Sequence, residues 1–197
     1  GSEMCIRDSA YGDGKESSCE NTVNSVQRLF YNIPINTYFS LDLDGISALN
    51  DSVGGVDVVS PETIGDFVEG ESYHLVGQQA ESFVRTRDTS KVDSNNMRMQ
   101  RQKVYIQSFM NTVLQQTKKD LTTPLDLFNA SAPYSCTNLN PSKVTYLAQQ
   151  AVLGGMNGID MVSVPGQVKM GSKYAEFNVS EAEFYQMFLS IYYTKIE

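Results

Sequence analysis

The sequence predicts an α/β (α+β) fold with a mixed β-sheet flanked by helices in a layered sandwich. Two observations indicate this class. Segments with the 3.6-residue periodicity of amphipathic helices are interspersed with short segments typical of strands, and the chain has no internal repeat. A chain of 197 residues, 41% of them apolar, is long enough to bury one sizeable core, so we expect a single domain.

The first half of the chain is expected to alternate helices and strands. Ser17 to Glu20 can cap the first helix, and Asp44 can cap the second. The Ser60-Pro61 pair ends a strand, because proline cannot continue a backbone hydrogen-bond ladder. The expected elements are, in order, a helix ending at about residue 31, a strand over 35–43, a short helix over 44–49, strands over 56–59 and 73–76, and a helix over 78–84.

The second half is dominated by one long helix. Its core-facing stripe is indicated by Ile106, Phe109 and Val113, spaced three and four residues apart. Pro141 is typical of the first position of a helix. The expected elements are, in order, a polar loop over 89–96, the long helix, an irregular stretch over 122–140, a helix over 141–153, strands over 161–170 and 174–179, and a final helix capped at 180–183 that ends at residue 193.

The overall charge excludes one class of function. The chain carries 15 basic and 23 acidic residues, a net charge of -8, whereas nucleic-acid binders need a basic face to neutralise phosphates. We therefore expect no nucleic-acid partner, and any anion site must be local. No stretch approaches the roughly 18 consecutive apolar residues that span a bilayer. The chain as given is expected to be soluble.

The first nine residues are set apart from the rest. Gly1-Ser2 is typical of a cloning scar, and residues 3–9 show no clear pattern, so we expect residues 1–9 to be non-native. Cys5 lies in this segment. Cys19 and Cys136 could form one disulfide outside the cytoplasm or stay as two buried thiols, and the sequence leaves both open.

No metal site is predicted from the residues. The three cysteines lack the paired spacing of a zinc site. Asp44 is expected to be a helix cap, and Asp42, Asp51 and Asp57 are expected at strand edges or turns. The only histidine, His74, is expected to be structural, because catalysis by histidine needs a positioned partner.

Five donor-rich side chains form the candidate site. Arg98, Arg101 and Gln102 are spaced i, i+3 and i+4, so they project from one face near the start of the long helix. The free N–H groups and the dipole of a helix N-terminus also favour an anion. Arg85 and Arg87 share a side if the backbone there is extended. The planar arginine fork grips two oxygens at once, which suits phosphate or pyrophosphate.

A second interpretation of the arginines is structural. Most arginine clusters in acidic proteins form solvated pairs with neighbouring carboxylates. Here Glu81, Asp88 and Asp93 are close enough in sequence to be those partners. Composition and spacing alone therefore leave two possibilities open, a local anion site and a set of surface ion pairs.

Several motifs together resemble the signature of the LytR-CpsA-Psr family, also described as the cell envelope-related transcriptional attenuator domain. They cover most of residues 10–193 and include a two-arginine motif, an R-x-x-R-Q motif and a D-x-x-G-G-V-x-V motif. The matching segments are A-Y-G at 10–12, N-D-S-V-G-G-V-D-V at 50–58, L-V-G-Q-Q-A at 75–80, V-R-T-R at 84–87, R-M-Q-R-Q at 98–102 and V-P-G at 164–166.

The resemblance implies an extracytoplasmic, membrane-anchored phosphotransferase. Such an enzyme moves a glycopolymer, teichoic acid or capsular polysaccharide, from a polyprenyl-pyrophosphate carrier to peptidoglycan with the help of magnesium. Family domains begin earlier, with strands that carry the magnesium-binding aspartates. Residues 10–197 are therefore expected to be one such domain that lacks its N-terminal strands, its magnesium ligands and its membrane anchor.

The resemblance also implies roles for the site residues. Arg85, Arg87, Arg98 and Gln102 would hold the pyrophosphate, with Arg101 adjacent. No catalytic residue is assigned. The alternative function is a non-catalytic module that binds polyprenyl pyrophosphate or another polyanion and has a regulatory role in the cell envelope.

Overall fold

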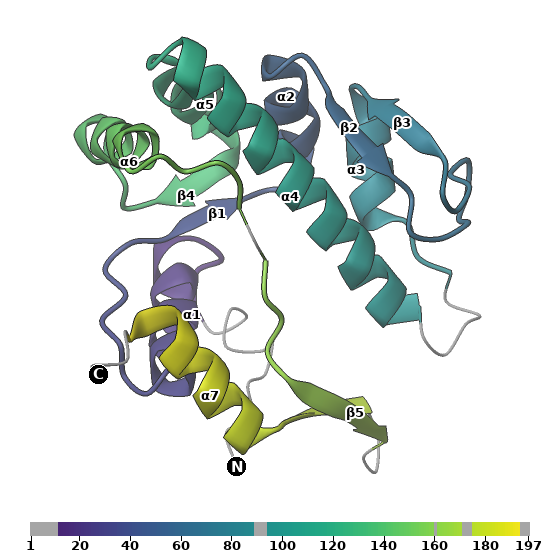
Figure 1. Ribbon diagram of the computed structural model, residues 1–197, viewed down its shortest axis with the longest axis vertical. Coiled ribbons are helices and arrows are strands. Elements are labelled where there is room, and N and C mark those ends of the chain that lie inside the picture. The colour runs from purple at the N-terminus through teal and green to yellow at the C-terminus, as the bar shows by residue number, and fades with distance from the viewer. Residues whose placement is uncertain (1–11, 89–93, 160, 171–174, 194–197) are drawn as a thin grey trace. The chain divides into compact units, whose positions relative to one another are not determined.

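Helices and short strands alternate along the chain, which confirms the predicted α/β class (Figure 1). The structure is a computed structural model that describes residues 12–88, 94–159, 161–170 and 175–193. Its elements, in chain order, are α1 (Glu16–Leu29), β1 (Phe39–Leu41), α2 (Asp44–Ser52), β2 (Val56–Val59), β3 (Ser72–Leu75), α3 (Gln78–Arg85), α4 (Ser94–Lys119), α5 (Thr123–Ser131), the 3-10 helix η2 (Ala132–Tyr134), β4 (Ser135–Thr137), α6 (Pro141–Leu153), β5 (Gly166–Met170), β6 (Ala175–Val179) and α7 (Glu181–Tyr192).

The chain divides into two compact units, Gly1–Asp160 and Met161–Glu197. The first unit contains the elements from α1 to α6, including strands β1 to β4. The second contains the β5–β6 hairpin followed by α7. All five residues of the predicted anion site belong to the first unit, as does the main hydrophobic cluster.

The described strands form three separate two-stranded antiparallel sheets, β1–β4, β2–β3 and β5–β6. Two of these sheets pair consecutive strands. The β1–β4 pair is non-local, with Phe39 opposite Thr137 and Leu41 opposite Ser135. Because each sheet is so small, most of the packing in the first unit is left to the helices.

Two predicted elements have the predicted boundaries. Strand β2 covers Val56–Val59, and helix α6 covers Pro141–Leu153. Asn140 caps α6, since its side-chain Oδ1 accepts a hydrogen bond from the backbone N–H of Lys143 at 2.9 Å. Pro141 stands in the first turn, where its missing N–H needs no partner.

The strand predicted over 35–43 is shorter than expected and covers only Phe39–Leu41. In its sheet β1 pairs with β4, which is only three residues long. The residues of 35–43 that lie outside Phe39–Leu41 therefore have no strand residues opposite them. Tyr31 and Asn32, just before this segment, both have positive φ angles and end the preceding helical turn. The pattern alone could not show the length of the partner strand.

The stretch 122–140 was expected to be irregular, and this expectation is wrong. It contains α5, η2 and β4. Pro124 and Pro133 each lie in the first turn of a helical segment, where proline is compatible with the helix. The prolines therefore mark helix starts in this stretch and do not break it.

Two predicted helix caps also differ from the structure. Helix α1 begins at Glu16, before the expected capping residues, and the Ser17 and Ser18 hydroxyls accept hydrogen bonds from the N–H groups of Asp13 and Gly14. Asp44 is the first residue of α2, which runs on to Ser52 instead of ending at residue 49. In both cases the residues just before the helix take part in the turn that starts it.

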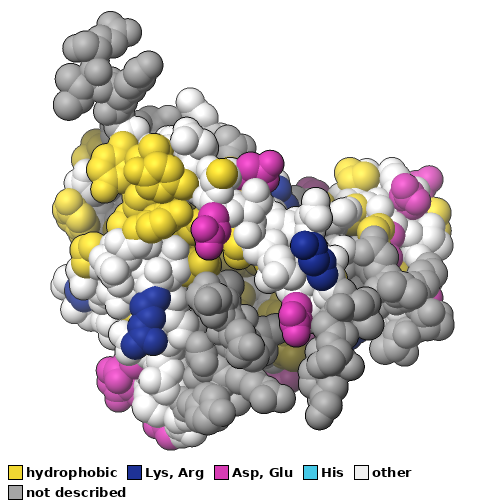
Figure 2. Space-filling model, turned by 90° about the horizontal axis from the view of Figure 1, so that it is seen from below, with side chains coloured by type: hydrophobic (Ala, Val, Ile, Leu, Met, Phe, Trp, Pro, Cys, Tyr) yellow, Lys and Arg dark blue, Asp and Glu magenta, His cyan; other side chains and the backbone are white. Residues whose placement is uncertain are grey.

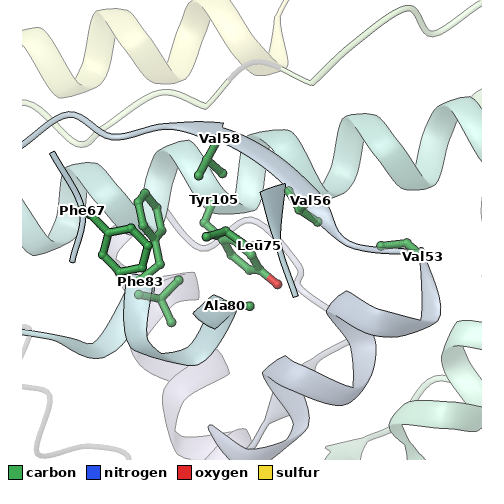
Figure 3. Packing of buried hydrophobic residues seen from close by; sticks show 9 residues of the cluster. Val53, Val56, Val58, Phe67, Leu75, Ala80, Phe83 and Tyr105 are labelled. Carbon is green, nitrogen blue, oxygen red and sulfur yellow. The ribbon is translucent and has the colours of Figure 1, made fainter. Parts of the chain in front are cut away.

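The core of the first unit lies between the β2–β3 hairpin and helices α3 and α4 (Figure 3). Val56 and Val58 point inward from β2, with Leu75 opposite Val56 on β3. Phe83 of α3 is fully buried and meets the ring of Phe67 edge-on, with 5.0 Å between the ring centroids. This cluster fixes α3 against the hairpin.

A buried polar group joins three elements at the edge of this core. Asn50 of α2 is fully buried, and its Nδ2 donates to the backbone oxygen of Leu75 in β3 at 2.8 Å. The hydroxyl of Tyr105 in α4 donates to Asn50 Oδ1 at 3.3 Å. Burial raises the pKa of the Tyr105 phenol well above its ordinary value, so the phenol stays protonated and keeps this donor.

Helix α4 is the longest helix and carries an apolar stripe in which Tyr105 is buried and Phe109 and Val113 pack against the hydrophobic cluster. Ile106, which the sequence places in this stripe, is instead 45% exposed, and Met99 and Met110 of α4 are also exposed. Among the described residues, neither α4 nor any other helix combines the length and the apolarity needed to cross a membrane.

The core predicts a clear stability difference between two apolar residues. Phe83→Ala removes a fully buried ring and should lower the free energy of unfolding by about 3–5 kcal/mol. Val59→Ala, at an exposed position of β2, should change it by less than about 1 kcal/mol. Urea unfolding followed by circular dichroism measures both. Equal losses for the two variants would contradict the described core.

Candidate functional site

The five predicted site residues come together where α3 ends and α4 begins. Arg85 is the last residue of α3, and Arg87 follows two positions later. Arg98, Arg101 and Gln102 lie in the first turns of α4, which packs against α3. We call these five residues and their backbone the α3–α4 junction. The structure thus brings together two motifs that are separated in the sequence.

Arg101 occupies the interior of the junction. Its side chain is fully buried, and its Nε donates to Glu62 Oε1 at 2.6 Å. Its two terminal nitrogens donate to the backbone oxygens of Phe83 and Thr86. All three guanidinium nitrogens are therefore used within the protein. Arg101 joins Glu62 to the end of α3, a structural role that the sequence did not predict when it grouped Arg101 with the pyrophosphate-binding residues.

Gln102 completes the same arrangement. Its Nε2 donates to the backbone oxygen of Val84 at 3.2 Å. The last carbonyl groups of a helix lack partners within the helix, and here side chains of α4 supply them. Arg101 and Gln102 together therefore cap the C-terminal end of α3 from the neighbouring helix. This contact sets the position of Arg85 and Arg87.

Arg85, Arg87 and Arg98 are placed differently from Arg101. The Arg85 side chain is 63% exposed, and its Nη1 donates to Glu81 Oε1 at 2.8 Å, which is one of the surface pairs considered from the sequence. Arg87 is exposed, and Arg98 is half-buried. These three arginines are the residues of the junction that a ligand can reach.

The junction has the chemistry of a local anion site. A guanidinium carries five N–H donors, and the bond to Glu81 uses one of those of Arg85. The Glu81 carboxylate is mostly buried and also orients the Arg85 fork. The N-terminal turns of α4 add the positive end of a helix dipole next to the arginines. An anion with several oxygens, such as pyrophosphate, matches this set of donors.

The charge on the rest of the surface does not form a second such site on the face drawn in Figure 2. There, lysine and arginine side chains are scattered among acidic ones, without a continuous basic patch. This distribution agrees with a net charge of -8. A negative ligand would therefore be held by a few placed arginines, and long-range attraction would contribute little.

Glu62 is a functional residue that the sequence did not single out. It is buried, pairs with Arg101 and lies 39 positions before it. Its own backbone oxygen accepts a hydrogen bond from the Ser60 hydroxyl at 2.7 Å, which fixes the turn after β2. No local pattern marks an acidic residue whose partner is so distant in the chain. Only the folded structure identifies this pair.

The glycine-rich motif at 50–58 positions the start of α3. Asp51 Oδ1 accepts a hydrogen bond from the N–H of Gly77, the N-cap residue of α3, at 2.7 Å. Gly77 has a φ of 54°, a conformation that favours glycine. Asn50 fixes Leu75, two residues before Gly77, by donating a hydrogen bond to its backbone oxygen. Both ends of α3 are therefore fixed by side chains from other elements.

His74 has two partners on the β2–β3 hairpin. Its Nδ1 lies 2.8 Å from Asp57 Oδ1, and its Nε2 lies 3.1 Å from the backbone oxygen of Gly54. A Cβ atom on Gly55 would meet His74 Nε2 at 2.5 Å, so the ring packs directly on this glycine. The sequence did not predict the Asp57 partner, and through these contacts the ring joins β3 to β2 and to the turn before it.

The described residues offer no site for the metal that the family resemblance implies. Within residues 12–88, 94–159, 161–170 and 175–193, no group of three or more histidine, cysteine or acidic side chains lies close enough together to hold a metal ion. Asp42, Asp51 and Asp57 are not gathered at one place.

Comparison with known proteins identifies the family. The sequence pattern of the LytR_cpsA_psr family matches residues 8–190, which is most of the chain. The chain belongs to the LytR-CpsA-Psr family. The matched range includes the whole α3–α4 junction and the motif at 50–58, so both features are parts of a LytR-CpsA-Psr domain.

Three relatives place this LytR-CpsA-Psr chain among known proteins. TagU of Bacillus anthracis, a polyisoprenyl-teichoic acid–peptidoglycan teichoic acid transferase, is 42% identical over 62 residues, which cover 29% of this chain and 20% of TagU. The structure of Bacillus subtilis TagU is 18% identical with a TM-score of 0.63, covering 97% of this chain and 77% of that one. A structure of TagT bound to LI-WTA is 16% identical with a TM-score of 0.67, covering 94% and 69%.

These comparisons carry different amounts of information. At 16–18% identity, the likeness to the two solved structures shows the fold. The aligned segment spans a fifth of the length of the curated TagU relative. The family and the fold of the LytR-CpsA-Psr domain are thus established, and the activity of the whole protein is a separate question.

The junction predicts that two arginines differ strongly in their contribution to stability. Arg101→Ala leaves the buried Glu62 carboxylate and two backbone oxygens without their partner, and should lower the free energy of unfolding by about 3–5 kcal/mol. Arg85→Ala removes an arginine whose side chain is 63% exposed but leaves the mostly buried Glu81 carboxylate without that partner, and should cost about 1–2 kcal/mol. Urea unfolding near neutral pH measures both variants.

A third variant separates the charge of Arg101 from its shape. Arg101→Lys keeps the positive charge but cannot donate to three acceptors in the same plane, so it should recover only part of the lost stability. If Arg101→Ala unfolded as easily as Arg85→Ala, the buried network would not hold the junction together.

Proposed function

We propose that this protein is a phosphotransferase that moves a cell-wall glycopolymer from a polyprenyl-pyrophosphate carrier to peptidoglycan outside the cell membrane. Family membership and the likeness to TagU support the class of reaction. The TagU relative is named for transferring teichoic acid from a polyisoprenyl carrier to peptidoglycan, so teichoic acid is the first polymer to test, with capsular polysaccharide as the other.

The observation that carries the proposal is the α3–α4 junction. Arg85, Arg87 and Arg98 are reachable and belong to elements that Arg101 and Gln102 lock together. We assign the binding of the pyrophosphate to Arg85, Arg87 and Arg98, with Gln102 at the edge of the site. Arg101 is a positioning residue, because its donors are committed to Glu62 and to the end of α3.

The proposed transfer breaks one phosphorus–oxygen bond of the pyrophosphate. An acceptor group of peptidoglycan attacks the phosphorus that carries the glycopolymer, and polyprenyl phosphate leaves. Negative charge builds up on the departing oxygen, and arginines already held in place stabilise it without rearrangement. Their rigid placement matters because phosphoryl transfer depends mainly on positioning and electrostatics.

Binding of the carrier is the first test. Calorimetry with a short, soluble polyprenyl pyrophosphate should detect binding to the chain. Arg98→Ala and Arg85→Ala should each weaken it by about 10- to 100-fold, since each removes charge-assisted hydrogen bonds. Arg28→Ala is the matched control, because Arg28 is an exposed arginine of α1 outside the junction and its loss changes the net charge equally. No binding at millimolar ligand, or equal weakening by all three, would exclude the junction as the pyrophosphate site.

Turnover is the second test and separates an enzyme from a binding module. The full-length natural protein should release polyprenyl phosphate from a lipid-linked glycopolymer in the presence of peptidoglycan. The Arg85→Ala and Arg98→Ala substitutions should abolish most of this release, whereas Arg28→Ala should not. Binding of the carrier without any release would favour the alternative, a polyprenyl-pyrophosphate binding module with a regulatory role.

A further inference from the structure

We propose that Cys19 and Cys136 form a disulfide bond that ties helix α1 to the β1–β4 pair. Both residues are half-buried thiols in the structure. Cys19 lies in α1 and Cys136 is the central residue of β4, far away in the sequence. The inference rests on the geometry of the first unit and on the location outside the cell membrane that belongs to the proposed function, but it does not depend on the transferase activity.

Three elements bring the two thiols to one place. In the β1–β4 pair, Ser40 stands directly opposite Cys136, so their side chains lie on the same face. Cys19 and Ser40 line the same cavity, of about 390 Å³, between α1 and the segment that leads into β1. Cys19 and Cys136 are therefore neighbours across Ser40.

The backbone distance also suits a cross-link. Residues of α1 and β4 approach to within 8 Å between Cα atoms, and Figure 1 shows α1 next to β1 and β4. A disulfide joins Cα atoms that are about 4.4–6.8 Å apart. The Cys136 side chain is close enough to the Cys19 thiol to affect its pKa through a hydrogen bond, as is that of Ser40.

The surroundings of the pair affect its reactivity. Burial, followed by the hydrogen bond and the charge of Cys136, raises the pKa of the Cys19 thiol above its ordinary value. The thiolate is the attacking species in thiol–disulfide exchange, so oxidation should accelerate as the pH increases. The cavity beside Cys19 gives an oxidant access to this sulfur.

The reaction needs an oxidant of the disulfide class. One protein thiolate attacks the disulfide of the oxidant and forms a mixed disulfide, and the second protein thiolate then displaces the reduced oxidant. In total the two protein S–H bonds and the S–S bond of the oxidant break, one protein S–S bond forms, and two electrons and two protons pass to the oxidant, which is reduced to two thiols. The space outside the cell membrane, where we place this protein, is compatible with such a bond.

A cross-link here would stabilise a helix that packs outside the main core. Helix α1 contributes no residue to the main hydrophobic cluster, and Ser18 is its only buried residue. The cavity under α1 shows that its contact with the β1 segment is incomplete. Because the bond closes a loop of more than about 100 residues, it removes much of the freedom of the unfolded chain.

The cross-link can be detected directly. A Cys5→Ser variant, which leaves only the two thiols in question, is treated with oxidised glutathione and then alkylated. We expect a mass about 2 Da lower than that of the reduced protein, no alkylation, and a tryptic fragment that joins residues 16–28 to 120–143. Alkylation of both thiols after this treatment would overturn the proposal.

Stability and a matched variant test the geometry. Reduction should lower the melting temperature of the Cys5→Ser protein by about 5–15 °C, and Cys5→Ser with Cys19→Ser should already melt at the lower temperature in either buffer. The matched control carries Cys5→Ser, Cys19→Ser and Glu20→Cys, which moves the thiol to the neighbouring exposed position of α1. It should not link to Cys136. Equal melting temperatures with and without reductant, or an equally complete link in the control, would contradict the proposed tether.

Discussion

The buried guanidinium of Arg101 is the interaction on which the rest of the site depends. It neutralises Glu62 and supplies donors to two backbone oxygens at the end of α3. A buried charge is costly unless its partners are all present, so α3, α4 and the turn after β2 must adopt one arrangement together. This arrangement sets the positions of Arg85, Arg87 and Arg98. The buried Arg101 network therefore determines the part of the junction that a ligand can reach.

The opposite end of α3 is held by a second polar network. Asn50 and Asp51 bind Leu75 and Gly77, so the motif at 50–58 and the motif at 75–80 are two halves of one contact. The short helix between these fixed ends has little freedom to move. Such rigidity suits a site whose proposed task is to meet the charge of a leaving group with donors that are already in place. Two family motifs that are separate in the sequence, 50–58 and 75–80, thus hold the same helix, α3.

Local signals in the sequence predicted the elements whose causes are local. The boundaries of β2 and α6 follow from a valine-rich segment and from a proline in the first turn of the helix, and both are confirmed. The strand predicted over 35–43 was too long because its length is set by a partner strand almost a hundred residues away. The stretch 122–140 is more regular than its prolines indicate, because Pro124 and Pro133 stand in the first turns of α5 and η2, where proline is compatible with a helix.

The sequence by itself determined the fold class, the family resemblance and the cluster of arginines, because periodicity and motif spacing are written along the chain. It could not assign different tasks to Arg98 and Arg101, which are three residues apart on one helix face. Only the tertiary structure decided that Arg101 is buried against Glu62 while Arg98 is half-buried and reachable. The same holds for Cys19 and Cys136. Burial and long-range pairing depend on contacts between segments that are distant in the chain, and a local sequence pattern carries no information about those contacts.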